Sequence, residues 1–142
     1  MKPPSRFRVL FVCIGNACRS PMAESIARRD AADIIEPSSA GLYPLGRVSL
    51  GTEEVLLANG YSVDELSSKP LRSEAIENAD LIINLSGERR ELIFDDPSRV
   101  EDWKVADPYG EDPAIYQRIL EEIEGRVRLL ASRLREGDRS AK

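Results

Sequence analysis

The sequence has no histidine and only two cysteines, Cys13 and Cys18. Without an imidazole, histidine-based catalytic triads are excluded, and any catalytic acid or base must be a carboxylate. Two cysteines are also too few for a zinc site with four soft ligands or for a disulfide framework. Free cysteines fit the reducing cytosol, so we expect a cytoplasmic protein that uses no metal and no cofactor.

Basic charge and long apolar runs are scarce as well. The formal net charge of −5 argues against a nucleic-acid partner, because such a partner requires a clustered basic face. No apolar run is long enough for membrane insertion, and the basic and apolar start is too short for a signal peptide. We expect one domain over residues 1–142 with a frayed polar tail at 136–142. The sequence does not indicate the oligomeric state.

Short β-branched runs alternate with helical patterns along the chain. We expect strands at 9–12, 34–38 and 81–85, with a weaker candidate at 100–105, and helices at 22–31, 50–59, 73–78, 88–94 and 114–135. Ser20-Pro21, Ser49 and Asp112-Pro113 are typical helix starts. In the last helix, apolar residues recur every three or four positions and predict one buried stripe: Ile115, Ile119, Ile123, Val127, Leu130 and Leu134. The alternation predicts a doubly wound α/β fold, with a mainly parallel sheet flanked by helices on both faces.

The most informative segment is residues 8–24, R-V-L-F-V-C-I-G-N-A-C-R-S-P-M-A-E. A strand delivers Cys13 to a turn at the carboxyl edge of the sheet, where ligands of such folds bind. The helix that follows points its positive end at the same place, which favours a phosphate dianion and the Cys13 thiolate. Arg19 can bind two phosphoryl oxygens at once. We therefore predict a phosphate-binding loop made of Ile14, Gly15, Asn16, Ala17, Cys18, Arg19 and Ser20.

Individual residues of this loop suit that role. Gly15 allows the backbone to approach a ligand closely, and Asn16 tolerates a left-handed conformation better than most residues. Ser20 can either hydrogen-bond the sulfur of Cys13 or cap the helix.

A second segment, A-D-P-Y-G at 106–110, offers a carboxylate. Displacement of an oxygen leaving group from phosphorus is easier when an acid gives that oxygen a proton. Pro108 favours an extended conformation at Asp107, although the same string is also typical of a simple turn. Because a thiolate nucleophile needs an acid and the chain has no histidine, we predict that Asp107 is the general acid. Tyr109 is predicted to form part of the substrate pocket.

Residues 9–24 resemble the signature of the low-molecular-weight protein tyrosine phosphatases. Ser39-Ala40-Gly41, residues 79–82 and residues 105–110 resemble further motifs of that family, so the resemblance spans about residues 6–135. It implies a four-stranded sheet, phosphorylated protein substrates and catalysis without metal. It also implies roles for five residues: Cys13 as nucleophile, Arg19 as phosphate ligand, Ser20 as thiolate stabiliser, Asn16 as loop organiser and Asp107 as acid. We expect the reaction to pass through a phosphocysteine intermediate.

The role of Cys18 stays open at this point. It is either a small buried hydrophobic residue or, as the resemblance supports, a redox partner that traps oxidised Cys13 as a disulfide.

The substrate is also open. Phosphotyrosine requires a slot with apolar walls, for which Ile14, Leu42 and Tyr109 are candidates, and it is our first choice. Phosphoarginine is the alternative, because D-P-Y-G-E-D-P-A-I-Y resembles the spacing in relatives that act on protein arginine. Those relatives typically have threonine before the second loop cysteine and tyrosine-directed ones often have isoleucine, whereas this chain has Ala17. Arsenate reduction ranks lower, since no cysteine follows Cys18. Non-catalytic phosphate binding is the remaining alternative.

Overall fold

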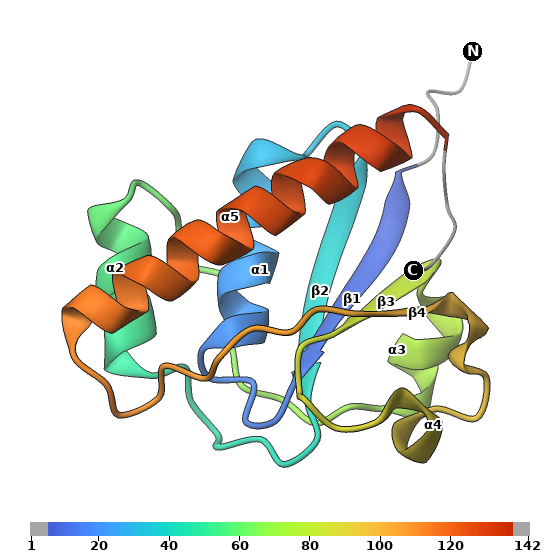
Figure 1. Cartoon of the computed structure of the whole chain (residues 1–142), viewed down its shortest axis with the longest axis horizontal. Coiled ribbons are helices and arrows are strands. Elements are labelled where there is room, and N and C mark those ends of the chain that lie inside the picture. Colours follow the sequence, from blue (N-terminus) through green and yellow to red (C-terminus); the bar gives the residue numbers. More distant parts are fainter. Residues whose placement is uncertain (1–5, 138–142) are drawn as a thin grey trace.

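A parallel four-stranded sheet forms the centre of the computed structural model, which describes residues 6–137. The strands are β1 (Phe7–Cys13), β2 (Ile35–Gly41), β3 (Leu81–Asn84) and β4 (Val100–Asp102). Their order is β2-β1-β3-β4, and Val9 of β1 lies opposite both Pro37 and Leu81. The chain thus moves first to one side of β1 and then to the other, which creates a switch point at the carboxyl end of β1. Figure 1 shows the loop after β1 at that edge, beside the segment that leads into α5.

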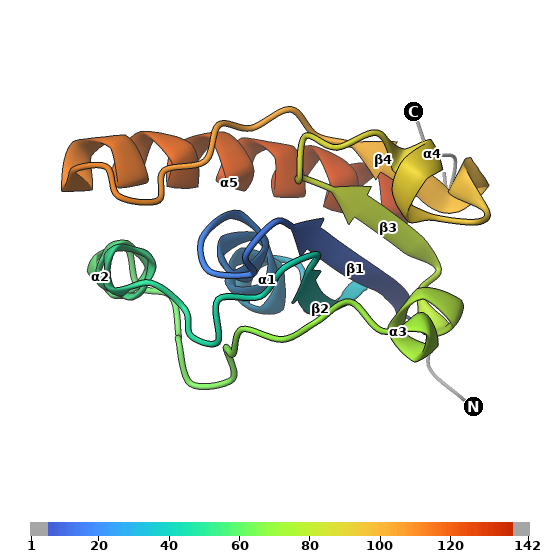
Figure 2. The ribbon, with the colours of Figure 1, turned by 90° about the horizontal axis from the view of Figure 1, so that it is seen from below.

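Helices cover both faces of the sheet, which confirms the predicted doubly wound α/β class. On one face, α1 (Arg19–Asp30) and α5 (Pro113–Arg135) pack against Val9 and Phe11. On the other face, α3 (Ser73–Asn78) and α4 (Arg90–Ile93) pack against Leu10 and Val12. The strand β1 is therefore apolar on both sides, as buried parallel strands are. Figure 2 shows α2 (Leu50–Ala58) beside α1 and α5, away from the sheet.

Several element boundaries differ from the prediction. Helix α1 begins at Arg19, three residues before the predicted start, because proline is tolerated in a first turn. Its N-cap is Cys18, with no capping side chain, so Ser20 is not a cap. Helix α4 is shorter than the predicted 88–94, because the side chains of Asn84 and Ser86 bind the N–H groups of Ser86 and Glu88 in a turn. Strand β2 extends to Gly41, whereas β4 ends at Asp102.

Helix α5 matches its prediction closely. Asp112 caps it by accepting a hydrogen bond from the N–H group of Ile115 at 3.1 Å. The predicted stripe is buried except for Ile115, which is half-buried. The N–H groups of Glu136 and Gly137 donate to the carbonyl oxygens of Ser132 and Leu134 where the helix ends, and the rest of the predicted frayed tail lies outside the described residues. Within residues 6–137, no helix is long and apolar enough to cross a membrane.

Candidate active site

The carbonyl groups of the loop between β1 and α1 are bound by neighbouring segments. The acceptors are the carbonyl oxygens of Cys13, Ile14, Gly15 and Ala17. The donors come from the chain after β2, the start of α2 and the chain before α3. They are the N–H groups of Leu42, Tyr43, Leu45 and Ser49 and the hydroxyls of Thr52 and Ser68, at distances of 2.8–3.1 Å.

These outward bonds fix the direction of the loop N–H groups. The described peptide bonds are all trans, so the N–H group after each carbonyl lies in the same peptide plane and points in the direction opposite to the carbonyl. The N–H groups of Ile14, Gly15, Asn16 and Cys18 are thereby turned away from the supporting segments, and no hydrogen bond between described residues occupies them. An anion enclosed by the loop would meet donors that are already oriented.

The sulfur of Cys13 has a specific hydrogen-bond partner. Sγ of Cys13 lies 2.9 Å from Oγ of Ser20, and both residues are buried. Nδ2 of Asn16 donates to the same Ser20 oxygen at 2.8 Å. Because an amide NH₂ cannot accept, the Ser20 proton is left for the sulfur. The hydroxyl is therefore oriented to stabilise a thiolate. Asn16 also has a φ of 48°, a left-handed conformation that asparagine tolerates better than most residues.

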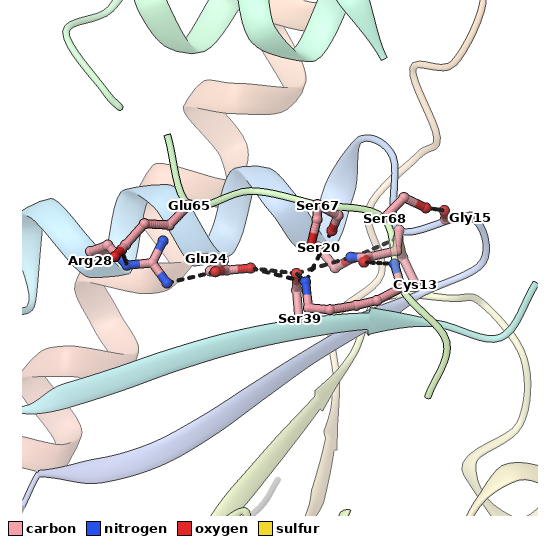
Figure 3. A network of polar contacts seen from close by, with 11 residues as sticks. Cys13, Gly15, Ser20, Glu24, Arg28, Ser39, Glu65, Ser67 and Ser68 are labelled. Carbon is pink, nitrogen blue, oxygen red and sulfur yellow. Dashed lines mark hydrogen bonds and ion pairs between the residues drawn. The ribbon is translucent and has the colours of Figure 1, made fainter. Parts of the chain in front are cut away.

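A polar network fixes the Asn16 amide, and Figure 3 shows the part of it around Ser20, Ser39 and Glu24. Its Oδ1 accepts from the N–H group of Lys69 at 2.9 Å, and its Nδ2 also donates to Ser39, 3.0 Å away. Ser39 in turn donates to the buried carboxylate of Glu24 at 2.5 Å, and Arg28 forms an ion pair with Glu24 at 2.6 Å. Because the carboxylate only accepts and the Lys69 N–H only donates, the orientation of the Asn16 amide follows from its partners. Burial lowers the pKa of Lys69, while the charge of Glu24 opposes that shift.

Arg19 connects the loop to the predicted acid segment. Its side chain is buried, and Nη1 donates to the carbonyl oxygen of Val105 at 3.1 Å. Nη2 lies 3.5 Å from Oδ2 of Asp107. The buried Nε has no hydrogen-bond partner among the described residues. A buried guanidinium donor without a partner is costly, and an anion in the loop would satisfy it.

The segment around Asp107 is a turn. The N–H group of Tyr109 donates to Oδ1 of Asp107 at 3.1 Å, and Glu111 N–H donates to the Pro108 carbonyl oxygen at 2.8 Å. Gly110 has a φ of 81°, a conformation that favours glycine. The turn holds the half-exposed Asp107 carboxylate beside Arg19. The turn and a catalytic carboxylate are therefore compatible with each other.

One cavity of about 200 Å³ collects most of the predicted residues. Its lining consists of Cys13, Ile14, Gly15, Ala17, Cys18, Arg19, Leu45, Asp107 and Tyr109. The side chains of Asn16 and Ser20 lie behind the loop. Leu42, a predicted wall, does not line this cavity and instead faces a separate groove with Leu71 and Leu92. The sequence reasoning missed Leu45, which approaches Gly15 from the chain after β2.

Cys18 has polar neighbours despite its burial. Its sulfur lies 3.4 Å from Oγ of Ser49 and 3.6 Å from the hydroxyl oxygen of Tyr116. Burial is the main cause that raises the pKa of Tyr116, so this residue stays a phenol. Cys13 and Cys18 are both free thiols. The interpretation of Cys18 as merely a small hydrophobic residue is thus incomplete.

Comparison with known proteins identifies relatives of this chain by sequence and by structure. A family model described as low molecular weight phosphotyrosine protein phosphatase matches residues 8–140. The chain is 32% identical to a protein-arginine-phosphatase of Bacillus subtilis, over 92% of this chain and 99% of the relative. The structure of a low molecular weight protein tyrosine phosphatase from T. tengcongensis is similar with a TM-score of 0.79 and 32% identity, covering 89% of this chain and 99% of the other. An arginine phosphatase from Geobacillus stearothermophilus gives 0.82 at 27% identity, with 92% and 94% covered.

A parallel α/β fold with a cysteine and an arginine in the loop between β1 and α1 is typical of the class of small cysteine-based phosphatases. Within that class, the chain belongs to the low molecular weight phosphotyrosine protein phosphatase family. Other relatives are named arsenate reductase, among them one from Bacillus cereus. Family membership therefore does not identify the substrate, which has to be inferred from the residues of the site.

Proposed function

We propose that this protein hydrolyses phosphotyrosine in proteins, with Cys13 as nucleophile, Arg19 as phosphate ligand and Asp107 as general acid. The observation that carries the proposal is the shared cavity: three residues from two distant segments line one space of about 200 Å³. The loop N–H groups and the Arg19 guanidinium surround a position for a tetrahedral dianion. The sulfur lies in the wall of the same space.

The reaction has two steps. The Cys13 thiolate attacks phosphorus, the bond to the leaving oxygen breaks, and Asp107 gives that oxygen its proton, which yields phosphocysteine and the free tyrosine. Water then attacks the phosphocysteine and gives a proton to Asp107, and the sulfur–phosphorus bond breaks to restore the thiolate. The hydroxyl of Ser20, at 2.9 Å from the sulfur, stabilises the departing thiolate.

The walls of the cavity favour an aromatic substrate. Leu45 and Tyr109 are more than half exposed, and both line the cavity above the loop with Ile14. Apolar and aromatic walls gain free energy from contact with a phenyl ring, whereas a charged guanidinium would lose hydration against Ile14 and Leu45 and could stack only on the ring of Tyr109. Asp107 is the only acidic side chain in the lining.

Phosphoarginine is the second candidate, and the similarity to arginine phosphatases favours it. In this reaction Asp107 would protonate the leaving guanidine nitrogen. Ala17 adds neither a hydroxyl nor bulk to the lining, so it selects neither substrate. Arsenate reduction is not proposed, because the chain has no cysteine after Cys18 to relay oxidation.

The test is phosphate release from matched phosphotyrosine and phosphoarginine peptides, with a thiol reductant and without metal. We expect faster release from phosphotyrosine, and no release by Cys13→Ser. Faster release from phosphoarginine would replace the substrate but keep the mechanism. Absence of release from both peptides by a protein that still binds phosphate would refute the phosphatase proposal.

We further propose that Cys18 is the redox partner of Cys13. Both thiols line the same cavity, and the surroundings that favour the Cys13 thiolate also make it open to peroxide. Peroxide oxidises Cys13 to sulfenic acid, and the Cys18 sulfur then attacks it to form a disulfide with loss of water. A thiol reductant restores both residues.

A further inference from the structure

We propose that Thr52 and Ser49, at the start of α2, are positioning residues that aim the Cys18 N–H group at the bound phosphate. They do so by holding the preceding carbonyl, that of Ala17. This inference rests on the proposed function and concerns the same loop. It assigns a task to two hydroxyl residues that touch neither the nucleophile nor the acid.

The Ala17 carbonyl oxygen is bound from two sides. Oγ1 of Thr52 donates to it at 2.8 Å, and the N–H group of Ser49 donates to it at 3.1 Å. Thr52 is fully buried at 0% exposure, so its hydroxyl has no water to bind instead. The trans peptide then directs the N–H group of Cys18 to the opposite side, toward the cavity that Cys18 lines.

The direction of each hydrogen bond in this cluster can be worked out. A carbonyl oxygen only accepts, so the Thr52 proton is used on Ala17, and the Ser49 hydroxyl must donate to Thr52, 2.8 Å away. The Tyr116 hydroxyl must therefore donate to Ser49, at 3.1 Å. The Cys18 thiol, 3.4 Å from Ser49 and 3.6 Å from Tyr116, is left as the first donor of the series, with one proton for one of these two oxygens. The hydroxyl groups of Tyr116, Ser49 and Thr52 thus donate in series, and the last acceptor is the Ala17 carbonyl oxygen.

The backbone around Gly51 shows how closely this cluster is packed. A Cβ atom at Gly51 would lie 2.5 Å from the ring of Tyr116. The close approach lets the Tyr116 hydroxyl reach Ser49 while α2 stays against the loop. The position of the Ala17–Cys18 peptide is therefore set from outside the loop, by α2 and α5.

Each loop donor contributes to phosphate affinity because a hydrogen bond to a charged group is stronger than one between neutral groups. Without the Thr52 hydroxyl, one buried donor to Ala17 is lost, and the N–H group of Ser49 holds the Ala17 carbonyl from one side instead of two. We expect phosphate affinity to fall roughly tenfold, the size of one such bond.

The experiment compares Thr52→Val, which keeps the shape and removes the hydroxyl, with Thr52→Ser, which keeps the hydroxyl. Inorganic phosphate binding is measured without turnover by isotope-edited NMR, following the Cys18 amide. We expect Thr52→Val to bind phosphate roughly tenfold more weakly, with a smaller shift of the Cys18 amide on binding, and Thr52→Ser to restore both. Thr52→Ala supplies the same comparison if the valine variant does not fold.

Unchanged phosphate affinity in Thr52→Val would overturn the inference. Equal losses in the valine and serine variants would also overturn it, because only packing would then matter. Turnover of phosphopeptides by the wild-type protein is measured in parallel. If wild type turns over and Thr52→Val binds phosphate normally, the inference alone fails. If Thr52→Val shows the expected loss but wild type hydrolyses no phosphopeptide, the proposed function alone fails.

Discussion

Replacement of Gly41 by alanine tests how tightly the loop between β1 and α1 is packed against β2. Gly41 is the last residue of β2, and a Cβ atom there would lie 2.8 Å from the Ile14 carbonyl oxygen and 2.9 Å from the backbone nitrogen of Asn16. Ordinary van der Waals contact begins near 3.4 Å, so the separation must open by about 0.6 Å. The atoms that must move belong to the loop backbone, whose N–H groups we expect to bind phosphate.

We expect two effects of Gly41→Ala. Overpacking of this kind costs about 1–3 kcal/mol of the free energy of unfolding, measured by urea denaturation. A displacement of about 1 Å at reacting groups costs about 100-fold in rate, so about 0.6 Å predicts a loss of kcat/KM on the order of tenfold. The assay is hydrolysis of a phosphotyrosine peptide at temperatures where the variant is fully folded.

Gly125→Ala is the matched control. Gly125 lies in α5, and apart from the adjacent backbone of that helix a Cβ atom there meets no atom of the described residues within 4 Å. Alanine should be neutral or stabilise the helix by up to about 1 kcal/mol, with activity unchanged. A Gly41→Ala protein as active and as stable as Gly125→Ala would contradict this prediction, because the loop would then have space for a Cβ atom that the structure does not show.

Three further predictions concern the acid, the second thiol and one buried phenol. Asp107→Asn should lower kcat by about 100-fold or more for a tyrosine leaving group and much less for a phenol with a low pKa, measured with a series of aryl phosphates; equal losses across the series would contradict the acid role. Cys18→Ser should keep its activity in reductant but recover less of it after peroxide treatment, since Cys13 then oxidises further; full recovery by thiol would count against the redox role. Tyr61 is buried and bonded to Glu124, which raises its pKa above the usual 10.0. Above about pH 10 the folded state therefore keeps the Tyr61 proton, whereas the unfolded chain loses it. The contribution of Tyr61 to the free energy of unfolding is fully present below about pH 10 and is lost as the pH rises above that value. Tyr61→Phe should flatten the fall in free energy of unfolding between about pH 9 and pH 11, and an unchanged slope would remove Tyr61 as its cause.

The sequence was sufficient for the fold because local signals agree with one another. The β-branched run before Cys13, the Ser49 and Asp112 caps and the stripe of α5 each predict their element, and the alternation of strands and helices determines the class. Ser20 shows where local reasoning leaves two alternatives. Its residue type suits either a helix cap or a hydrogen bond to the Cys13 sulfur, and the structure has the contact with the sulfur, while Cys18 is the N-cap.

The structure brings together the three residues predicted to form the centre of the site, Cys13, Arg19 and Asp107. They meet because the carboxyl ends of the strands lie at one edge of a parallel sheet. The supporting residues were beyond reach of the sequence. Leu45, Thr52 and Lys69 reach the loop from irregular segments or a helix start, and their contacts depend on tertiary packing that no local pattern encodes. Leu42 was misplaced for the same reason, since the path of the chain after β2 decides which face its side chain joins.

The most direct test of the account is acid quenching during turnover of a phosphotyrosine peptide, followed by mass spectrometry of the digested protein. We predict one transient phosphoryl group on the peptide that contains Cys13, formed at the rate of tyrosine release and absent in Cys13→Ser. Turnover without any protein-bound phosphoryl group, or with that group on a different residue, would contradict it.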